Sequence, residues 1–320
     1  MNKSLDRAWA GPGDTLGSLR LSLTGRRLRL SVAVVLLVLS GVGPSAAETK
    51  PLRLCADPDN LPFSSNHPET PGLYLEIGEA IGRVMGRPTT AVWNLTYFGK
   101  RSVRTTLLAG QCDASVGLPD DQDFMGPRVI FSKPLLQVGY ALVTSKSTRV
   151  SGLNDLRGRS VAVQFASTPQ SMLAQHDNIR MVTFREPEEA MRALAAAQVD
   201  VAFIWGPTAG YMNKTVLQDA FNVVPVAGPG MQWPAAVAFP RGQALLCDEV
   251  NRAIDTLGTV IDALKLKYGF PTAEPMTLSA NGTAAAPTLT SLNARRAEAA
   301  APFSGCAGRG ADNRPDHVDN

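Results

Sequence analysis

Apolar residues in the first part of this chain fall into short buried runs separated by helix-spaced segments. Leu52 to Ala56 and Asp113 to Gly117 have the length and composition of buried strands, and Thr89 to Tyr97 alternates apolar with polar residues. Gly72 to Gly86 and Ser102 to Ala109 carry apolar side chains at helical spacing. The pattern therefore predicts a β-α-β-α-β unit, which is half of a doubly wound sheet.

The second part of the chain repeats this order after an extended segment at Gly139 to Thr144. In chain order, the repeat consists of a strand at Ser160 to Gln164, a helix beginning at Ser171 to His176, a strand at Met181 to Phe184, a helix at Pro187 to Ala197 and a strand at Val199 to Trp205. Val223 to Val226 and Ala235 to Phe239 then lead back, and Gln243 to Tyr268 is predicted to be one long closing helix. We expect an α/β protein with two doubly wound lobes and a cleft between them.

The two ends of the chain differ from this pattern. Three arginines precede an apolar run at Leu30 to Leu39, and small residues follow it, so residues 1–47 are predicted to be a signal peptide that directs the chain to the periplasm. The run is too short for a stable membrane span. Residues 51–143 plus 227–271 are assigned to lobe 1 and residues 144–226 to lobe 2. Residues 272–320 are rich in Ala, Pro and Gly and are predicted to be a disordered tail.

Removal of the signal peptide changes the charge balance. The whole chain has a formal net charge of +3, from 31 Lys and Arg against 28 Asp and Glu. The first 47 residues hold six of these basic residues and two of the acidic ones, which leaves 25 against 26. A nucleic-acid partner therefore has no electrostatic support.

Four cysteines remain after cleavage, and an oxidising compartment favours disulfides between them. Sequence spacing does not choose among the three possible pairings. Cys306 lies in the tail, where it either bonds back, for example to Cys247, or stays free for an intermolecular bridge. Neither the cysteines nor the clustered oxygens of Asp57, Asp59 and Asn60 match a zinc or EF-hand pattern, so no metal and no cofactor is expected.

The loop after the first strand is the strongest candidate site. In open α/β sheets, ligands bind beyond the carboxyl ends of the strands. The predicted cleft for a ligand or partner is therefore lined by the loops at these ends: Asp57, Asn60, Leu61, Pro62, Phe63, Gly117, Leu118, Pro119, Ser167, Thr168, Trp205, Gly206 and Pro207. Phe63 is interpreted as an exposed aromatic that contacts a ligand or caps its lobe, and Trp205 as lining either the cleft or the core. Asp155 and Asp200 are interpreted as turn and cap residues.

Several short motifs, in this order and spacing, resemble type II periplasmic solute-binding proteins. They are Pro62-Phe63, Leu107 to Asp113, Phe131 to Pro134, Leu153 to Gly158 and Ala193 to Asp200. In amino-acid binders of that superfamily, an arginine holds the ligand's carboxylate and an aspartate holds its amine, at positions that here are Met125 and Trp205. Since neither side chain can make those bonds, the resemblance does not extend to an α-amino-acid ligand.

Further segments resemble the quinoprotein-dehydrogenase-associated subgroup of these proteins, which includes the MoxJ and XoxJ accessory proteins of methanol oxidation. They are Cys55 to Ser64, Gly110 to Asp113, Gly117 to Pro119 and Ile204 to Tyr211. The resemblance implies a non-catalytic periplasmic partner of a PQQ-dependent dehydrogenase that assists its maturation or activation. It also implies a Cys55–Cys112 disulfide. The alanine- and proline-rich tail and the Gly72-Leu-Tyr-Leu start of the first helix depart from that subgroup.

Two alternatives stay open. One is a solute-binding protein of an ABC transporter, with apolar Leu61, Phe63, Met125 and Trp205 around the cleft favouring a ligand that is not an α-amino acid. The other is a lyase on the same fold that uses Asp57. The three histidines lie near no nucleophile in a recognisable arrangement, which speaks against other enzyme classes.

Overall fold

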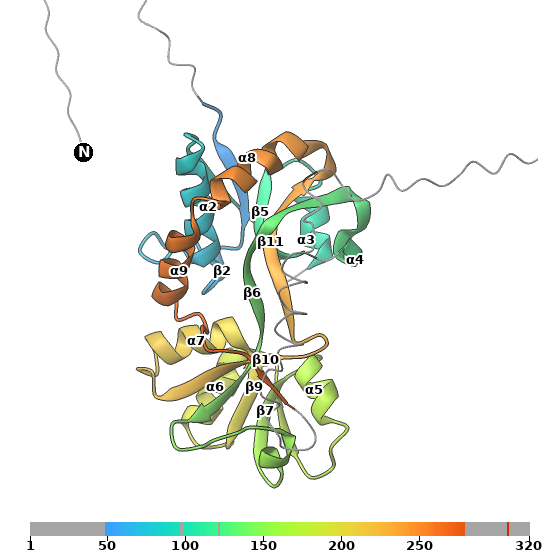
Figure 1. The fold of residues 1–320 in the computed structure, drawn as a ribbon, viewed down its shortest axis with the longest axis vertical. Helices are drawn as coiled ribbons and strands as arrows, with labels where there is room; N and C mark the ends of the chain where they lie inside the picture. Colours follow the sequence, from blue (N-terminus) through green and yellow to red (C-terminus); the bar gives the residue numbers. More distant parts are fainter. Residues whose placement is uncertain (1–48, 97–98, 121, 279–305, 307–320) are drawn as a thin grey trace, which may run out of the picture. The chain divides into compact units, whose positions relative to one another are not determined.

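A mixed sheet of parallel and antiparallel strands runs through the chain in the computed structural model, which describes residues 49–96, 99–120, 122–278 and Cys306 (Figure 1). Its strands follow the order β4-β1-β5-β11-β6-β9-β7-β8, and β10 pairs with both β6 and β12. The strands are β1 Leu52–Ala56, β4 Thr89–Trp93, β5 Ala114–Pro119, β6 Val129–Ser145, β7 Ser160–Gln164, β8 Arg180–Phe184, β9 Val201–Trp205, β10 Phe221–Ala227, β11 Gln232–Pro240 and β12 Met276–Thr277. A small separate hairpin joins β2 Asp59–Asn60 to β3 Ser64–Ser65.

Helices connect the strands. The α-helices are α2 Leu73–Val84, α3 Lys100–Thr105, α4 Gln122–Met125, α5 Thr168–Leu173, α6 Pro187–Ala195, α7 Gly206–Thr215, α8 Ala244–Ile254 and α9 Gly258–Lys267. Short 3-10 turns occur at η2 Gly126–Arg128, η3 Leu153–Leu156 and η4 Arg241–Gln243. None of the helices in these described segments is long and apolar enough to cross a membrane.

The strands form two parallel groups joined by one long strand. We call β4, β1 and β5, with α2, α3, α8 and α9, the first lobe, and β9, β7, β8 and β10, with α5, α6 and α7, the second lobe. Strand β6 pairs antiparallel with β11, β9 and β10 and so belongs to both (Figure 1). The α/β, two-lobed class is confirmed, and the residue boundaries of the lobes stay a prediction.

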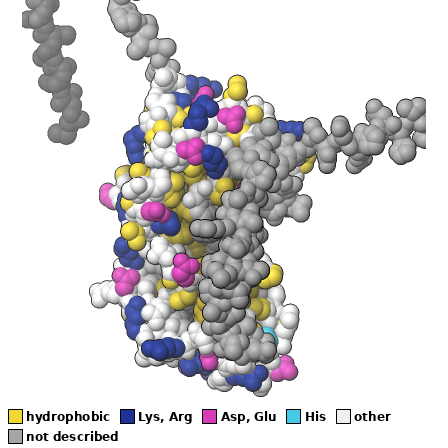
Figure 2. All heavy atoms as spheres, viewed as in Figure 1, with side chains coloured by type: hydrophobic (Ala, Val, Ile, Leu, Met, Phe, Trp, Pro, Cys, Tyr) yellow, Lys and Arg dark blue, Asp and Glu magenta, His cyan; other side chains and the backbone are white. Residues whose placement is uncertain are grey.

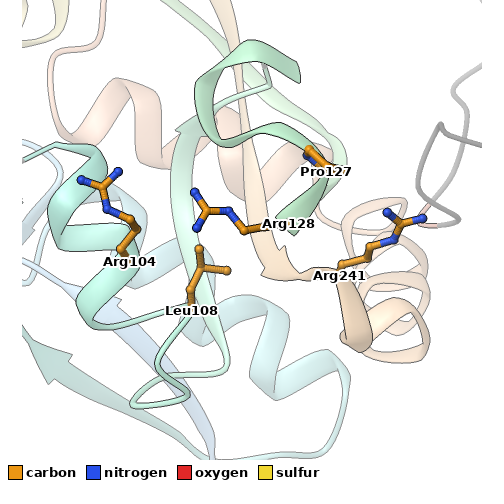
Figure 3. Close-up of a pocket in the computed structure, with 5 residues that line it drawn as sticks. All are labelled: Arg104, Leu108, Pro127, Arg128 and Arg241. Carbon is orange, nitrogen blue, oxygen red and sulfur yellow. The ribbon is translucent and has the colours of Figure 1, made fainter.

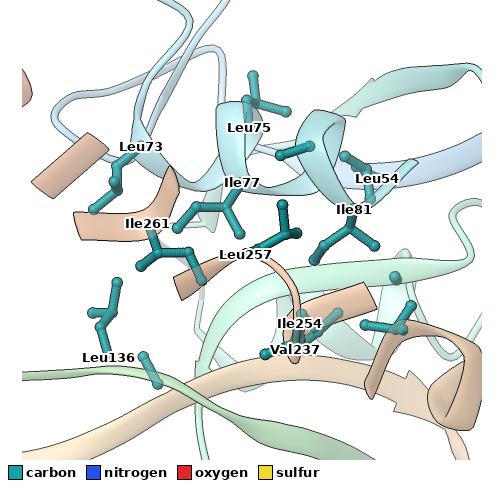
Figure 4. Packing of buried hydrophobic residues seen from close by; sticks show 14 of the residues in the cluster. Leu54, Leu73, Leu75, Ile77, Ile81, Leu136, Val237, Ile254, Leu257 and Ile261 are labelled. Atoms are coloured by element: carbon teal, nitrogen blue, oxygen red, sulfur yellow. The ribbon is translucent and has the colours of Figure 1, made fainter. Parts of the chain in front are cut away.

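The core of the first lobe forms around α2. Its residues Leu73, Ile77 and Ile81 recur at helical spacing and are fully buried, which places one apolar face of the helix toward the sheet and the closing helices (Figure 4). Leu54 on β1 and Ile261 on α9 pack in the same cluster. The apolar periodicity read from the sequence is thus the buried face of the helix.

The closing segment differs from its prediction. Instead of one helix from Gln243 to Tyr268, the chain forms α8 and α9, with a turn between Ile254 and Gly258. The backbone N–H of Leu257 donates to the Ile254 carbonyl in this turn, and both side chains are buried. Apolar residues at helical spacing continue on both sides of the turn, which is why the sequence pattern predicted a single helix.

The same pair of hydrogen bonds, made by an aspartate, occurs in both lobes at the start of the third strand. In the first lobe, the Asp113 carboxylate accepts the backbone N–H of Arg53, and Asp113 N–H donates to the Arg53 carbonyl. In the second, Asp200 makes the same two bonds with Ser160. The Asp155 carboxylate accepts the N–H groups of Ser151 and Gly152. Asp155 and Asp200 therefore act as the predicted turn and cap residues.

Two disulfides stabilise the first lobe. Cys55 is bonded to Cys112 with their Cα atoms 5.4 Å apart, and Cys247 is bonded to Cys306 with 5.7 Å between the Cα atoms. Cys306 is only 1% exposed, which places this tail residue in the core of the first lobe. Met276 and Thr277 pair with β10, while the predicted signal peptide and most of the predicted tail lie outside the described residues.

Candidate functional site

The loop after β1 is held in place by a buried carboxylate. Asp57 is 5% exposed, and one of its oxygens accepts the Asp59 N–H at 3.0 Å. The other accepts the backbone N–H and the hydroxyl of Thr96 at 2.6 and 2.7 Å. The Asp57 N–H donates in turn to the Ser64 hydroxyl. One carboxylate oxygen therefore holds the loop itself in shape, and the other connects the loop to Thr96, beyond the end of the neighbouring strand β4.

Phe63 lies inside the protein, which corrects the expectation of an exposed aromatic. The N–H groups of Leu73 and Tyr74 donate to the carbonyls of Pro62 and Phe63, so the loop is bonded to the first turn of α2. The Phe63 ring is 8% exposed and stacks on Tyr74 with the ring centroids 4.5 Å apart. These backbone hydrogen bonds between the loop and the helix hold the Phe63 ring inside the protein, and the local sequence pattern does not reveal them.

Five aromatic rings meet between the lobes. We call Phe63, Tyr74, Tyr140, Trp205 and Trp233 the aromatic cluster. Trp205, at the end of β9, stacks on Trp233 of β11 at 5.2 Å and lies 6.4 Å from Phe63. Tyr140 of β6 contacts the edges of both tryptophans, at 5.8 and 6.2 Å. Offset and edge-to-face pairs of this kind add stabilisation beyond the buried area alone.

A cavity of about 240 Å³ lies against this cluster. Seven predicted site residues line it, namely Asp57, Asn60, Phe63, Gly117, Leu118, Pro119 and Trp205. The remaining predicted residues do not. Leu61 packs against the core of the first lobe, and Pro62 is buried beneath the start of α2. Gly206 and Pro207 begin α7 and line a separate cavity of about 220 Å³.

The hydroxyl loop of the second lobe supports the cluster without lining the cavity. Ser167 caps α5 by accepting the Gln170 N–H at 3.2 Å. Thr168 hydrogen-bonds the Tyr140 hydroxyl through its backbone and its side chain. Burial raises the pKa of Tyr140, and these bonds oppose that rise. Thr168 thus positions an aromatic ring of the cluster.

The sequence prediction missed three rings of the cluster. Tyr74 lies in the first turn of α2, Tyr140 lies in the extended segment, and Trp233 lies in a strand beside a proline. Nothing local marks these residues as neighbours of Trp205. The one available signal was Trp233, a large aromatic next to Pro234 in a connection between predicted elements.

The cavity is chemically neutral apart from one carboxylate. No Lys, Arg or His is among its described lining residues, and Asp57 is the one acidic residue there, with both oxygens already bonded. The Tyr74 hydroxyl has no hydrogen-bond partner among the described residues, and burial raises its pKa. Met125, expected near the cleft, instead packs with Cys112 and Val129 in the core. An uncharged, largely apolar group suits this cavity.

No family model matches the chain, and neither does any curated protein. Among solved structures, the ancestral cationic amino acid solute-binding protein AncCDT-1 matches with a TM-score of 0.58 and 22% identity, over 68% of this chain and 95% of its own. The chain has the type II periplasmic-binding-protein fold. MxaJ from Methlophaga aminisulfidivorans MPT shares this fold, with a TM-score of 0.56, 22% identity and coverage of 69% of this chain and 99% of MxaJ.

A second structure of this fold is the periplasmic binding protein XoxJ from Methylobacterium extorquens AM1. Its TM-score is 0.55 at 22% identity, over 70% of this chain and all of XoxJ (100%). Proteins of the group that the short motifs resemble are therefore among the solved structures that share this fold. In this chain, the aromatic cluster lies at the junction of the two lobes, where β9 and β11 each pair with β6.

Proposed function

We propose that this protein is a non-catalytic periplasmic accessory protein of a PQQ-dependent alcohol dehydrogenase. The observation that carries the proposal is the aromatic cluster, which fills the junction of the lobes with the protein's own side chains. A protein that carries a polar solute needs polar groups converging on an open site. The likeness in fold to MxaJ and XoxJ supports the same proposal. The dehydrogenase as partner is inferred from the sequence resemblance.

The electrostatics of the cavity argue against an α-amino-acid ligand. Such a ligand brings a carboxylate and an ammonium group, and both lose their hydration on binding. The described lining offers no cation for the carboxylate, and the Asp57 oxygens are occupied by Thr96 and Asp59. The cost of desolvating both charges would therefore stay uncompensated.

Contacts between the lobes also argue against a transport cycle of opening and closing. Trp205 of the second lobe stacks on Trp233 of β11, a strand that pairs with β5 of the first lobe. The Tyr211 ring on α7 stacks on Tyr268, which follows α9 in the first lobe, at 6.4 Å. The Lys214 ammonium donates to the Leu266 carbonyl across the same boundary. Opening would break all of these contacts at once.

The test is capture of the partner. An affinity-tagged copy is purified from the periplasm of its own host, and bound proteins are identified by mass spectrometry. We expect a PQQ-dependent dehydrogenase subunit in the wild-type sample and its loss with Trp205→Ala. Phe165→Ala is the matched control, because this ring is 66% exposed and does not line the cavity. Circular dichroism establishes that both variants fold.

Absence of any dehydrogenase subunit would contradict the accessory role. Deletion of the gene provides a second readout, the specific activity of the dehydrogenase in the periplasm. We expect that activity to fall, and to be restored by the wild-type gene and by Phe165→Ala.

A second candidate function is binding of a small uncharged solute. It is favoured by the cavity itself, in which the Tyr74 hydroxyl is without a partner among the described residues. A cavity of about 240 Å³ accepts a ligand the size of a single substituted aromatic ring. A rise in melting temperature with such a metabolite, together with no dehydrogenase capture, would establish this function instead.

A further inference from the structure

Three arginines from separate elements line an open hollow on the first lobe (Figure 3). Arg104 lies in the last turn of α3, Arg128 ends η2, and Arg241 begins η4. Leu108 and Pro127 complete the described lining. None of these five residues lines the cavity at the aromatic cluster, so the hollow is a separate feature of the surface.

The three guanidinium groups have no acidic partner among the described residues. The ion pairs found there involve Arg53, Arg83, Lys133, Lys265 and Lys267 instead. No described Asp or Glu lines the hollow, and all three arginines are exposed. None of the described residues therefore neutralises these three positive charges.

This concentration of charge is local. After removal of the predicted signal peptide, the chain carries 25 basic against 26 acidic residues. On the face in Figure 2, Lys and Arg side chains alternate with Asp and Glu over the part that is not grey. Like charges held together without counter-charges repel one another and disfavour folding. Three arginines around one hollow thus favour an anionic group that approaches from outside.

The residue types indicate which anion. A guanidinium presents a planar fork of donors that matches a carboxylate with two parallel bonds. Leu108 and Pro127 provide apolar surface between the charges, which suits the methylene groups of a glutamate side chain. The hollow is open to solvent, with exposed side chains around it, and so fits a protruding segment better than an enclosed small anion.

We propose that Arg104, Arg128 and Arg241 form a docking site for a glutamate-rich segment of a protein partner. The site goes beyond the proposed function, because it depends neither on the aromatic cluster nor on the identity of the partner. Its contribution is greatest for the rate of association, since exposed charges steer an encounter more than they strengthen the final complex.

The test measures binding of a short fluorescein-labelled peptide of alternating glutamate and serine by fluorescence anisotropy at low ionic strength. The full chain is compared with R104Q/R128Q/R241Q and with R149Q/R157Q/R185Q. The second variant removes the same charge from three exposed arginines outside the hollow. We expect about tenfold weaker binding for the first variant, because three exposed ion pairs are lost and each contributes little alone. For the second variant we expect less than twofold weaker binding, because its three arginines lie outside the hollow.

A peptide with glutamine in place of glutamate should not bind, and added salt should weaken the wild-type complex steeply. Equal loss in the two triple variants would overturn the proposal, because binding would then follow net charge alone. It would also be overturned if inorganic phosphate displaced the peptide at equal concentration, or if phosphatidylglycerol vesicles bound with the same dependence on the three arginines. Those outcomes would identify a small-anion site or a membrane contact instead.

Discussion

At the scale of single residues, Gly117 explains how the cavity keeps its shape. Its φ of +89° lies in the region that glycine adopts without strain. A Cβ atom there would lie 1.9 Å from the Tyr74 ring. Tyr74 in turn stacks on Phe63, so the missing side chain allows two rings of the aromatic cluster to pack against the strand. Gly117, which was predicted at the cleft edge as the last residue of a strand and lies within β5, therefore has a steric role.

We expect Gly117→Ala to destabilise the protein by roughly 2–4 kcal/mol, from the strained backbone and the displaced Tyr74 ring together. Gly110→Ala is the control, because Gly110 also has a positive φ, +71°, but has nothing within 4 Å of an added Cβ. It should lose only the backbone part, roughly 1–2 kcal/mol. Urea unfolding gives both values, and near-ultraviolet circular dichroism should change for Gly117→Ala alone. Equal effects would contradict a role for Tyr74 packing.

At the scale of elements, α7 and α9 join the lobes through two glycines. A Cβ on Gly210 would lie 2.1 Å from the Gly269 carbonyl oxygen, so the two backbones are nearly in contact. Beside them, the Tyr268 hydroxyl donates to Glu76 and accepts the Gly72 N–H at 2.8 Å. Burial and the nearby Glu76 carboxylate raise the pKa of this hydroxyl. Gly72 directly precedes α2, so these two hydrogen bonds join the end of α9 to the start of α2 within the first lobe.

Gly210→Ala tests this contact. Alanine in a helix is normally more stable than glycine by about 1 kcal/mol. Here the added methyl would meet backbone that cannot move aside, so we expect destabilisation of roughly 2 kcal/mol or more. Gly258→Ala, at the start of α9 with nothing within 4 Å, should leave the free energy of unfolding unchanged or higher by up to ~1 kcal/mol. A stabilised Gly210→Ala variant in urea unfolding would refute close contact between the helices.

At the scale of the whole molecule, each lobe has one aspartate that connects its first strand to the start of its third strand. This residue is Asp113 in the first lobe and Asp200 in the second. Burial of the Asp113 carboxyl raises its pKa, but the hydrogen bonds and charge of Arg53 outweigh this and hold the pKa below its usual value. Hydrogen bonds from the Ser160 hydroxyl and backbone N–H lower the pKa of Asp200. Both groups therefore favour the folded state most strongly when ionised.

The protein should accordingly lose stability in acid. Because the folded pKa values are depressed, the contribution of both carboxylates is complete above the unfolded value of about 4 and disappears as the pH falls through the folded values. We expect the urea concentration at the unfolding midpoint of the wild type to decrease at pH values below about 4. Asp113→Asn with Asp200→Asn should lower the midpoint at pH 7 and flatten this decline. Asp248→Asn, an exposed carboxylate on α8, controls for the loss of negative charge. An unchanged pH profile in the double variant would contradict the assignment.

Much of the fold could be predicted because it depends on local patterns. Strand-length apolar runs and helix-spaced segments gave the α/β order, since buried faces have a fixed period in each element. Disulfides followed from the predicted export, and both are present in the structure. The position of the site loop followed from a general rule for parallel strands, and seven of the residues predicted for the whole site line the cavity.

Tertiary structure alone decided the rest. The rings of the aromatic cluster come from the β1 loop, α2, β6, β9 and β11, so their meeting depends on sheet pairing between residues far apart in the chain. The same holds for the turn that splits the closing helix and for Met125, which packs inside the first lobe. Hydrophobic periodicity specifies which face of an element is buried. It does not specify what covers that face, because the covering residues are chosen by packing of the whole chain.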